Sequence, residues 1–335
     1  MSRPVALAAL ALLLSATGSG EAATAKRCSA PPGIGGGFTT DFCRHLVPLS
    51  QFQAGGPGKD GIPALDHPHF APVSRVDWLA WREPVIELAV GHDVRAYPLE
   101  ILIWHEIAND QVGGVPVAVT FCPLCDTAIV FDRRVGGHTL SFATTGNLRN
   151  SDLVMYDRTT ESWWQQFGGQ ALVGHYAGTR LGQLPARIVA WREFLHAYPR
   201  GLVLTRDTGF SRPYGQNPYS GYDDAATPPF FPTAHANDRR LPPKERVVFI
   251  QRGRDSVVVP FSVLQRRHLI RVTVGGDHLV VRWRGGVVSA LDSASIPRGR
   301  DVGAASVSEH SKPVVFDEPF WFAVAAFRPH VRIIR

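Results

Sequence analysis

The chain has 335 residues, enough for one large domain or two ordinary ones with an ample core. Its 32 glycines, 26 prolines and eight tryptophans indicate many turns and aromatic core residues, which favours a β-rich protein over a helical bundle. The formal net charge is +6, but the arginines are scattered and form no basic stripe with aromatic residues, so we do not expect nucleic-acid binding.

Residues 1–25 are typical of a secretory signal peptide. Arg3 supplies the charge, residues 5–16 supply the apolar run, and Ala23-Thr24-Ala25 is a small-residue cleavage site. The apolar run is too short to span a bilayer, and no later run is long and apolar enough. The sequence therefore predicts a protein without a membrane span, periplasmic or secreted after cleavage near Ala25.

Residues 26–58 are rich in glycine and proline and predict an extended N-terminal arm. Cys28 and Cys43 bracket this segment. In an oxidising compartment we expect them to form a disulfide that pins the arm.

The first folded unit begins with alternating apolar residues at 83–90 and 94–97, which predict two strands. Pro98 fits the first turn of a short helix over residues 99–104. Residues 105–112 and 115–121 then predict a hairpin around Gly113-Gly114. This register places His105 opposite Cys122 on one face of the hairpin.

The motif Cys122-Pro-Leu-Cys125 allows three chemistries: a metal site, a redox-active dithiol, or an inert disulfide or structural thiols. Residues 128–132 continue as a strand, so the motif does not open a helix as it does in thioredoxin-like proteins. One Cys pair with His105 would make a three-ligand site with an open position, suited to Cu(I) or Zn. We assign Cys122, Cys125, His105 and Glu106 as candidate catalytic residues. No P-loop or Rossmann glycines occur, so no nucleotide cofactor is expected.

Further candidate ligand-binding residues lie in three places. Asn109 and Asp110 follow His105 and could orient metal ligands. The segment 146–164 and the long loop 205–224 are dense in polar groups, although a hydrogen-bonded turn and a loop covering a sheet edge explain them equally well. From these two segments the candidates are Arg149, Asn150, Asp152, Arg206, Asp207, Arg212 and Tyr214.

The chain contains a degenerate internal duplication. Residues 83–102 match residues 245–264 at a constant spacing of 162, with shared glutamate, glycine, aspartate and proline positions. In the second copy Arg267 replaces His105, His268 replaces Glu106 and Arg284 replaces Cys122, and residues 289–292 resemble 128–132. The first copy is therefore expected to hold a site and the second to be scaffold.

These features predict a mainly β protein with a few short helices, built on a duplicated strand–helix–hairpin unit. A single domain would span residues 59–335. It would contain repeat one (83–133, with following strands to about 190), an inserted helix and loop (191–243), and a degenerate, shortened repeat two (245–335).

The chain resembles an exported bacterial and archaeal family, the domain of unknown function numbered three-one-seven-nine. The matching segments run in order from Asp60 to Pro329 and include RAYPLEILIWHEIAND, VGGVPVAVTFCPLCDTAIVFDR and RDTGFSRPYGQNPYSGYD. The HEIxND and FCPLC blocks look like the hallmarks of the family. The resemblance implies that these residues belong together, but it implies no reaction.

We therefore hypothesise an extracytoplasmic protein that binds Cu or Zn through Cys122, Cys125 and His105. An open site beside a polar pocket would suit a metal-dependent oxidoreductase acting on a small molecule or protein. The alternatives are a thiol–disulfide redox protein using the same cysteines and a non-enzymatic factor that delivers metal to a partner.

Overall fold

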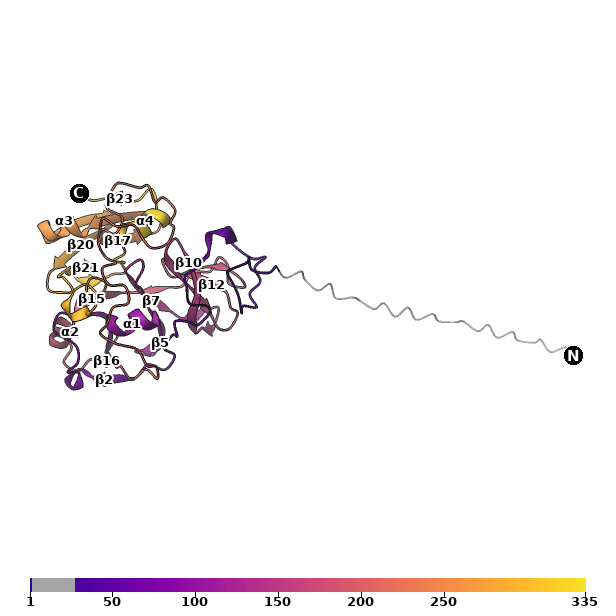
Figure 1. Cartoon of the computed structure of the whole chain (residues 1–335), viewed down its shortest axis with the longest axis horizontal. Helices are drawn as coiled ribbons and strands as arrows, with labels where there is room; N and C mark the ends of the chain where they lie inside the picture. The colour runs from indigo at the N-terminus through magenta and orange to yellow at the C-terminus, as the bar shows by residue number, and fades with distance from the viewer. Residues whose placement is uncertain (2–27) are drawn as a thin grey trace.

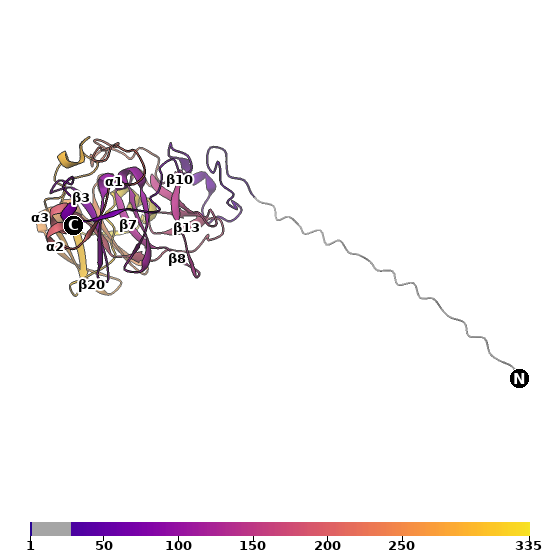
Figure 2. The same cartoon turned by 90° about the horizontal axis from the view of Figure 1, so that it is seen from below.

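The computed structural model describes Met1 and residues 28–335, so residues 2–25 of the expected signal peptide lie outside the described residues. Strand accounts for 39% of the chain and helix for 12%, which confirms the mainly β class with a few short helices. Five sheets are arranged as a ring that resembles a five-bladed β-propeller (Figures 1 and 2).

We name the sheets by a characteristic feature and give their strands in spatial order. The arm sheet contains β1 (Gln53–Ala54), β10 (Phe142–Arg149), β11 (Asp152–Asp157), β12 (Trp163–Gln165) and β13 (Gln170–Val173). The CPLC sheet contains β14 (Gln183–Leu184), β7 (Thr127–Asp132), β6 (Val115–Cys122) and β5 (Ile107–Val112). The β3 sheet contains β15 (Ala186–Ala190), β3 (Pro84–Val90), β4 (Asp93–Pro98), β16 (Leu202–Leu204) and β2 (Phe70–Pro72).

The other two large sheets belong to the second repeat. The β17 sheet contains β17 (Val247–Arg252), β18 (Asp255–Pro260) and β23 (Arg332–Ile333). The β20 sheet contains β19 (Leu269–Val274), β20 (Asp277–Arg284), β21 (Ala304–Glu309) and β22 (Lys312–Pro313). A small separate hairpin pairs β8 (Arg134–Val135) with β9 (His138–Thr139).

The α-helices of the described residues are short. They are α1 (Leu99–His105), α2 (Trp191–Ala197), α3 (Phe261–Arg267) and α4 (Trp321–Phe327), and single 3₁₀ turns occur at Leu49–Gln51, Val73–Arg75 and Ile296–Arg298. Each α-helix has seven residues, and among the described residues none is long and apolar enough to cross a membrane.

Side chains join neighbouring sheets around the ring. The Asn109 amide on β5 donates to the Phe142 carbonyl on β10 at 2.8 Å, which links the CPLC sheet to the arm sheet. Arg95 on β4 donates to Asp110 on β5 at 2.8 Å, which links the β3 sheet to the CPLC sheet. β15 lies against β21, and β17 lies against β19. Phe167, in the connection between β12 and β13, has its aromatic ring 5.5 Å from that of Phe249 on β17. This contact links the β17 sheet to the arm sheet and so closes the circle of sheets.

The structure reproduces the duplication element by element. Strand β4, helix α1 and strands β5 and β6 recur as β18, α3, β19 and β20 with the same lengths and the same spacing of 162 residues. The duplication also extends further than the sequence analysis expected. Helix α2 has a counterpart in α4: the Trp191 amide donates to the Glu83 carbonyl, and the Trp321 amide donates to the Glu245 carbonyl, each at 2.8 Å. Helix α2 therefore corresponds to part of the repeated unit, whereas the sequence analysis placed it in an insertion.

One part of the expected alignment is wrong. Residues 289–292 were aligned with the strand that follows the CPLC motif, but they do not pair with β20. The partner of β20 is β21, where Ala304 opposes Arg284 as Thr127 opposes Cys122 in the first copy. In the first copy the four residues 123–126 connect β6 to β7. In the second copy the longer connection 285–303 joins β20 to β21.

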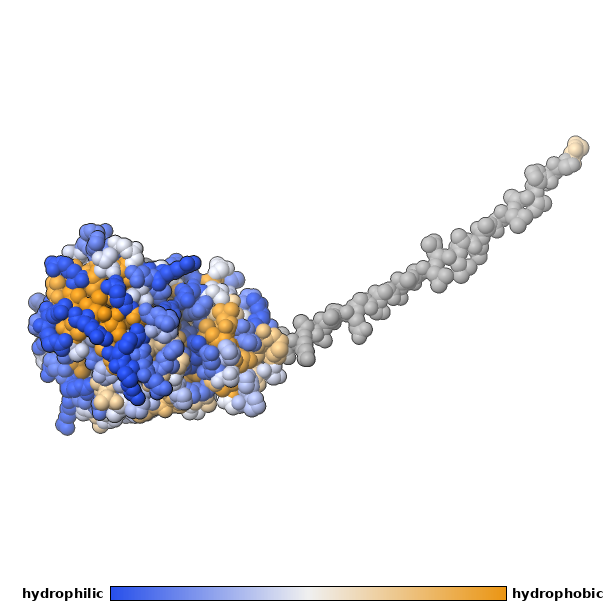
Figure 3. All heavy atoms as spheres, turned by 90° about the horizontal axis from the view of Figure 1, so that it is seen from above, coloured by the Kyte–Doolittle hydropathy of each residue, from blue (hydrophilic) through white to orange (hydrophobic). Residues whose placement is uncertain are grey.

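The N-terminal arm packs on the outer side of the arm sheet. The predicted disulfide between Cys28 and Cys43 is present, with Cα atoms 5.0 Å apart. Phe38, Phe42 and Phe52 place their rings 5.1–5.3 Å from the buried Trp163 ring in edge-on geometry. On the face shown in Figure 3, apolar residues gather in areas near the two ends of the folded part, with hydrophilic residues around and between them.

Candidate functional site

The CPLC motif forms the tip of a β-hairpin. Strand β6 ends at Cys122 and β7 begins at Thr127, and these two residues face each other across the ladder. The turn closes with Asp126 at a φ of 57°. Both cysteines are free thiols in this structure, with Cys122 1% and Cys125 0% exposed. The motif therefore lies at the turn between two strands and not at a helix start, as the sequence predicted.

Asp152 is the acidic residue that meets the two cysteines. It begins β11 after a tight turn in which Asn150 and Ser151 both have positive φ, 56° and 57°. The Cys125 thiol donates to Asp152 Oδ1 at 2.8 Å. The ligating atoms of Cys122, Cys125 and Asp152 all lie within 4.8 Å of one another. These three residues form the cysteine cluster.

The Asp152 carboxylate is held firmly in this position. The Phe167 amide donates to its Oδ2 at 2.9 Å, and the Gln165 side-chain amide donates to the same oxygen. Arg149 donates to Gln165 Oε1 at 3.2 Å, and the nearby Asp152 carboxylate opposes the lowering of the Arg149 pKa by burial. Burial raises the pKa of Asp152 to about 6, although these hydrogen bonds favour the charged form.

Glu106 is a second buried acid beside the cluster. It follows the last residue of α1 with a left-handed backbone, φ 57° and ψ −27°, and its amide donates to the Leu102 carbonyl at 2.7 Å. Burial, together with the nearby Asp152 carboxylate, raises the pKa of Glu106 to about 8. Burial also raises the pKa of the Cys122 thiol and, more strongly, that of Cys125.

The four groups gather potential negative charge, and the buried part of this site has the Arg149 guanidinium as the cation that interacts with Asp152. Among the ion pairs of the described residues, none involves Glu106 or Asp152. Burial favours the protonated forms of Glu106, Cys122 and Cys125, because an isolated buried anion is costly. A bound metal cation would reverse this and stabilise the thiolates and carboxylates.

The predicted position of His105 is wrong. The hairpin register itself is confirmed, with Asn109 opposite Ala118, but the ladder begins at Ile107. His105 is the last residue of α1 and does not face Cys122 across the hairpin. Its Nδ1 lies 2.7 Å from the Pro63 carbonyl and its Nε2 lies 2.7 Å from the Tyr214 hydroxyl.

These two contacts define the state of the imidazole. A carbonyl oxygen only accepts, so Nδ1 donates to Pro63 and Nε2 accepts the Tyr214 hydroxyl proton. Burial lowers the pKa of His105, which favours the neutral ring. Both ring nitrogens are therefore engaged within the protein, and His105 is not among the residues of the cysteine cluster.

Asn109 and Asp110 serve as bridges between sheets in this structure. The Asn109 amide also donates to Asp66, and its oxygen accepts from the Phe142 amide at 2.9 Å. Asp110 accepts two hydrogen bonds from Arg95 and one from the Tyr97 hydroxyl, at 2.6–2.9 Å. Their polar groups bind other parts of the chain, and neither residue belongs to the cysteine cluster.

The loop 205–224 covers α1. Arg206 makes two hydrogen bonds of 2.7 Å to the buried Glu100 of α1, and Tyr214 contacts His105 as described above. Arg212 has a buried Nε with no hydrogen-bond partner, and Asp207 is exposed and pairs with His69 at 3.1 Å. Arg206 and Tyr214 of the predicted loop residues thus contact α1 and His105, whereas the predicted Asp152 joins the cysteines.

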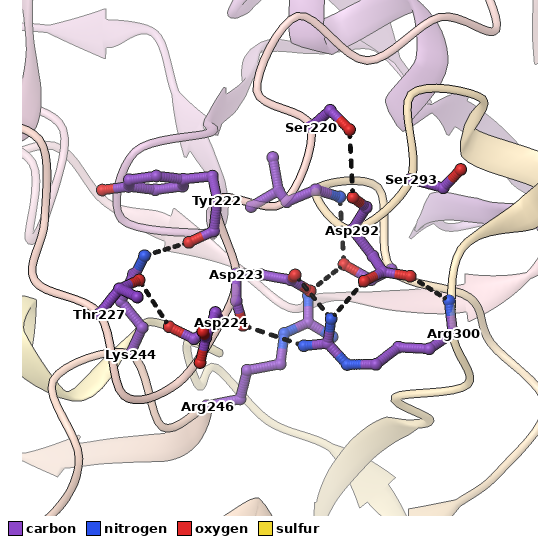
Figure 4. A network of polar contacts seen from close by, with 12 residues as sticks. Ser220, Tyr222, Asp223, Asp224, Thr227, Lys244, Arg246, Asp292, Ser293 and Arg300 are labelled. Carbon is purple, nitrogen blue, oxygen red and sulfur yellow. Dashed lines mark hydrogen bonds and ion pairs between the residues drawn. The ribbon is translucent and has the colours of Figure 1, made fainter.

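A polar network fastens the end of this loop to the second repeat (Figure 4). Arg300 donates to Asp223 and to Asp292, each at 2.7 Å. The Lys244 amine donates to the Tyr222 carbonyl and lies 4.1 Å from the centre of the Tyr222 ring. The Tyr222 hydroxyl in turn donates to the Leu124 carbonyl of the CPLC turn at 2.8 Å.

The second repeat also contacts the CPLC turn directly. Arg246 Nε lies 2.5 Å from the carboxylate of Asp126, the residue after Cys125, and the Phe320 amide donates to the Cys125 carbonyl at 2.9 Å. The sequence analysis did not single out Asp126, Tyr222 or Arg246. Only folding brings residues so distant in the sequence to this turn.

Comparison with known proteins agrees with the resemblance noted from the motifs. The family profile described as "Protein of unknown function (DUF3179)" matches residues 59–331. The chain belongs to the DUF3179 family. No curated protein and no solved structure matches this DUF3179 chain. The matched range includes the cysteine cluster, the loop 205–224 and the second repeat, and leaves out the N-terminal arm before residue 59.

Proposed function

We propose that this DUF3179 protein binds a metal ion through Cys122, Cys125 and Asp152. One observation carries the proposal: the ligand atoms of two buried thiols and the buried Asp152 carboxylate lie within 4.8 Å of one another, and Glu106, a second buried acid, interacts electrostatically with Asp152. Asp152 takes the place that the sequence analysis gave to His105.

The donor set favours zinc over Cu(I). Two thiolates suit both ions, but a carboxylate oxygen is a common zinc ligand and a poor match for a soft monovalent ion. Glu106 would stand beside the ion as a fourth ligand or as an acid–base group. Bound zinc would supply Lewis-acid chemistry and lower the pKa of a bound water.

Burial of the cysteines argues against the two alternatives. Thiol–disulfide exchange needs an accessible thiolate, and metal delivery to a partner protein needs an exposed ligand. Cys122 and Cys125 are enclosed and their thiol pKa values are raised. The resemblance of the N-terminus to a signal peptide and the Cys28–Cys43 disulfide support the proposal that the protein acts outside the cytoplasm.

Metal content and thiol oxidation of the purified protein test the proposal together. We expect one zinc ion per chain in the wild type, lost in C122S, C125S and D152N and retained in the matched variant H105Q. Thermal melting of each variant separates metal loss from unfolding. A metal-free protein with a complete Cys122–Cys125 disulfide would overturn the proposal and support the redox alternative.

A further inference from the structure

A cavity of about 380 Å³ lies where the β12–β13 connection meets β14, β17 and the segment 315–317. Phe167 lines this cavity, and its backbone amide donates to Asp152 of the cysteine cluster at 2.9 Å. None of the three cluster residues lines the cavity itself. The cavity is therefore a separate site next to the cluster.

The strand register shows which side chains share one side of the cavity. Phe249 and Gln251 are two residues apart on β17, so they leave the same face of the strand. Asp317 opposes Phe249 in an antiparallel bridge, which puts its side chain on that same face. Arg328 donates to Gln251 Oε1 from Nε at 3.3 Å and from Nη2 at 3.2 Å. All four residues line the cavity.

Arg180 and Arg328 are the two cations of the cavity without a carboxylate partner. The Arg180 guanidinium donates to the Gly168 carbonyl and to Gln170 Oε1. Among the ion pairs of the described residues, none involves Arg180 or Arg328. Burial, together with the nearby Arg180 charge, lowers the pKa of Arg328. Two like charges thus interact at one cavity with no anion to balance them.

The other charged residues of the lining do not supply that anion. Asp317 Oδ1 accepts from the Gln183 amide at 3.2 Å, and burial, together with the Asp152 carboxylate, raises the pKa of Asp317 to about 7. A large share of this carboxyl group is therefore protonated at neutral pH. Arg252 leaves the opposite face of β17 from Gln251 and pairs with Asp277 at 3.1 Å.

We infer that this cavity binds a small molecule through an oxyanion, a carboxylate or phosphate group, held by Arg180 and Arg328. Guanidinium groups recognise both oxyanions through charge-assisted, often paired hydrogen bonds. The volume lies in the range of small-molecule sites, about 300–1,000 Å³. Because the cavity uses no cluster residue, this inference does not depend on the metal proposed above.

Calorimetric titration of the purified protein at low ionic strength tests the inference, with inorganic phosphate and succinate as probes. We expect saturable binding, and the probe that binds more tightly distinguishes a phosphate from a carboxylate ligand. The dissociation constant should rise about tenfold or more in R180Q/R328Q and about threefold or more in R180Q. Binding should persist in C122S, which separates this result from the outcome for the metal.

The control variant R266Q/R267Q removes the same charge as R180Q/R328Q. Its two arginines lie exposed at the end of α3, away from the cavity lining, and it should bind as the wild type does. Arg180 is exposed, so R180Q keeps the test decisive if melting shows that R180Q/R328Q is unfolded. Absence of saturable binding of either probe, unchanged affinity in R180Q, or an equal loss in the control would overturn the inference.

Discussion

Glu106 illustrates how a single backbone conformation builds the site. A residue with positive φ ends α1 and turns the chain into β5, and glycine is the usual choice there. A side chain in that conformation costs roughly 1 kcal/mol. Here the residue carries a buried carboxyl group that interacts electrostatically with Asp152, and His268 takes the same conformation in the second repeat. Both copies thus keep this strained backbone position, and only the side chain at it changes, from a carboxyl group to an imidazole.

The raised pKa of Glu106 makes a prediction about stability and pH. In the metal-free protein its folded-state pKa of about 8 exceeds its ordinary value of 4.5. The folded state therefore loses stability as pH rises between these values, and Glu106→Gln should remove that loss. We expect the variant to gain up to roughly 4 kcal/mol over the wild type at pH 9 and little at pH 4.

Urea unfolding of both proteins with chelator present measures this difference. A constant gap between variant and wild type across the pH range would contradict the assignment. Excess zinc should reduce the difference in unfolding free energy between Glu106→Gln and the wild type if the metal stabilises the ionised carboxylate.

The buried thiols make a second prediction at the same scale. Burial raises the pKa of Cys122 and of Cys125, so few thiolates are available at neutral pH. We expect a water-soluble disulfide reagent to modify both residues slowly in the native protein and rapidly after unfolding. Labelling of the native protein at the rate of a free cysteine would support an exchange function for the dithiol.

At the scale of elements, the sequence predicted local structure well. Alternating residues and the Gly113-Gly114 turn gave the register of β5 and β6, which the structure confirms. The error lies at the junction before it, because His105 was assigned to the strand and instead ends α1. The left-handed residue Glu106 separates the two elements, and no propensity marks a glutamate for that conformation.

The partner of the cysteines was harder to predict. Asp152 was recognised as a candidate, but its link to Cys125 spans 27 residues and two sheets. Spacing rules apply within a strand or hairpin and say nothing about how separate hairpin tips meet. The same reason explains why Arg246 and Tyr222, which hold the CPLC turn, were not foreseen.

The contact between Arg246 and Asp126 makes a prediction about this turn. Asp126 is fully buried, so removing its cation leaves an uncompensated charge. We expect Arg246→Met to destabilise the protein by about 3–5 kcal/mol, and R246M/D126N to recover much of that loss. Chemical unfolding of the two single variants and the double variant gives the coupling energy. A double variant as unstable as the sum of the single variants would show that the pair is not coupled.

At the scale of the whole molecule, the ring of sheets is built by duplication and insertion. The elements from β4 to β6 recur as the elements from β18 to β20, and α2 recurs as α4. The first copy contains an additional unit between β7 and β14, which includes most of the arm sheet. That unit carries Asp152, so the cysteine cluster joins the duplicated core to a part that only the first copy has (Figure 1).

We expect the disulfide of the N-terminal arm to stabilise the folded protein without affecting metal binding by the cysteine cluster. Cys28 and Cys43 are 15 residues apart, and closing a loop of this length contributes about 3 kcal/mol. We expect C28S/C43S to lower the free energy of unfolding by this amount while metal content stays unchanged. Loss of metal in this variant, at a temperature where it is folded, would show that the arm is required for the site.

Cobalt substitution tests the central claim most directly, since Co²⁺ replaces zinc and its thiolate bonds give a charge-transfer band in the near-ultraviolet. We expect that band in the wild type. It should be weakened in C122S and in C125S, shifted in D152N and unchanged in H105Q. A protein that develops no such band under reducing conditions, or that loses it in H105Q, would contradict a metal centre of Cys122, Cys125 and Asp152.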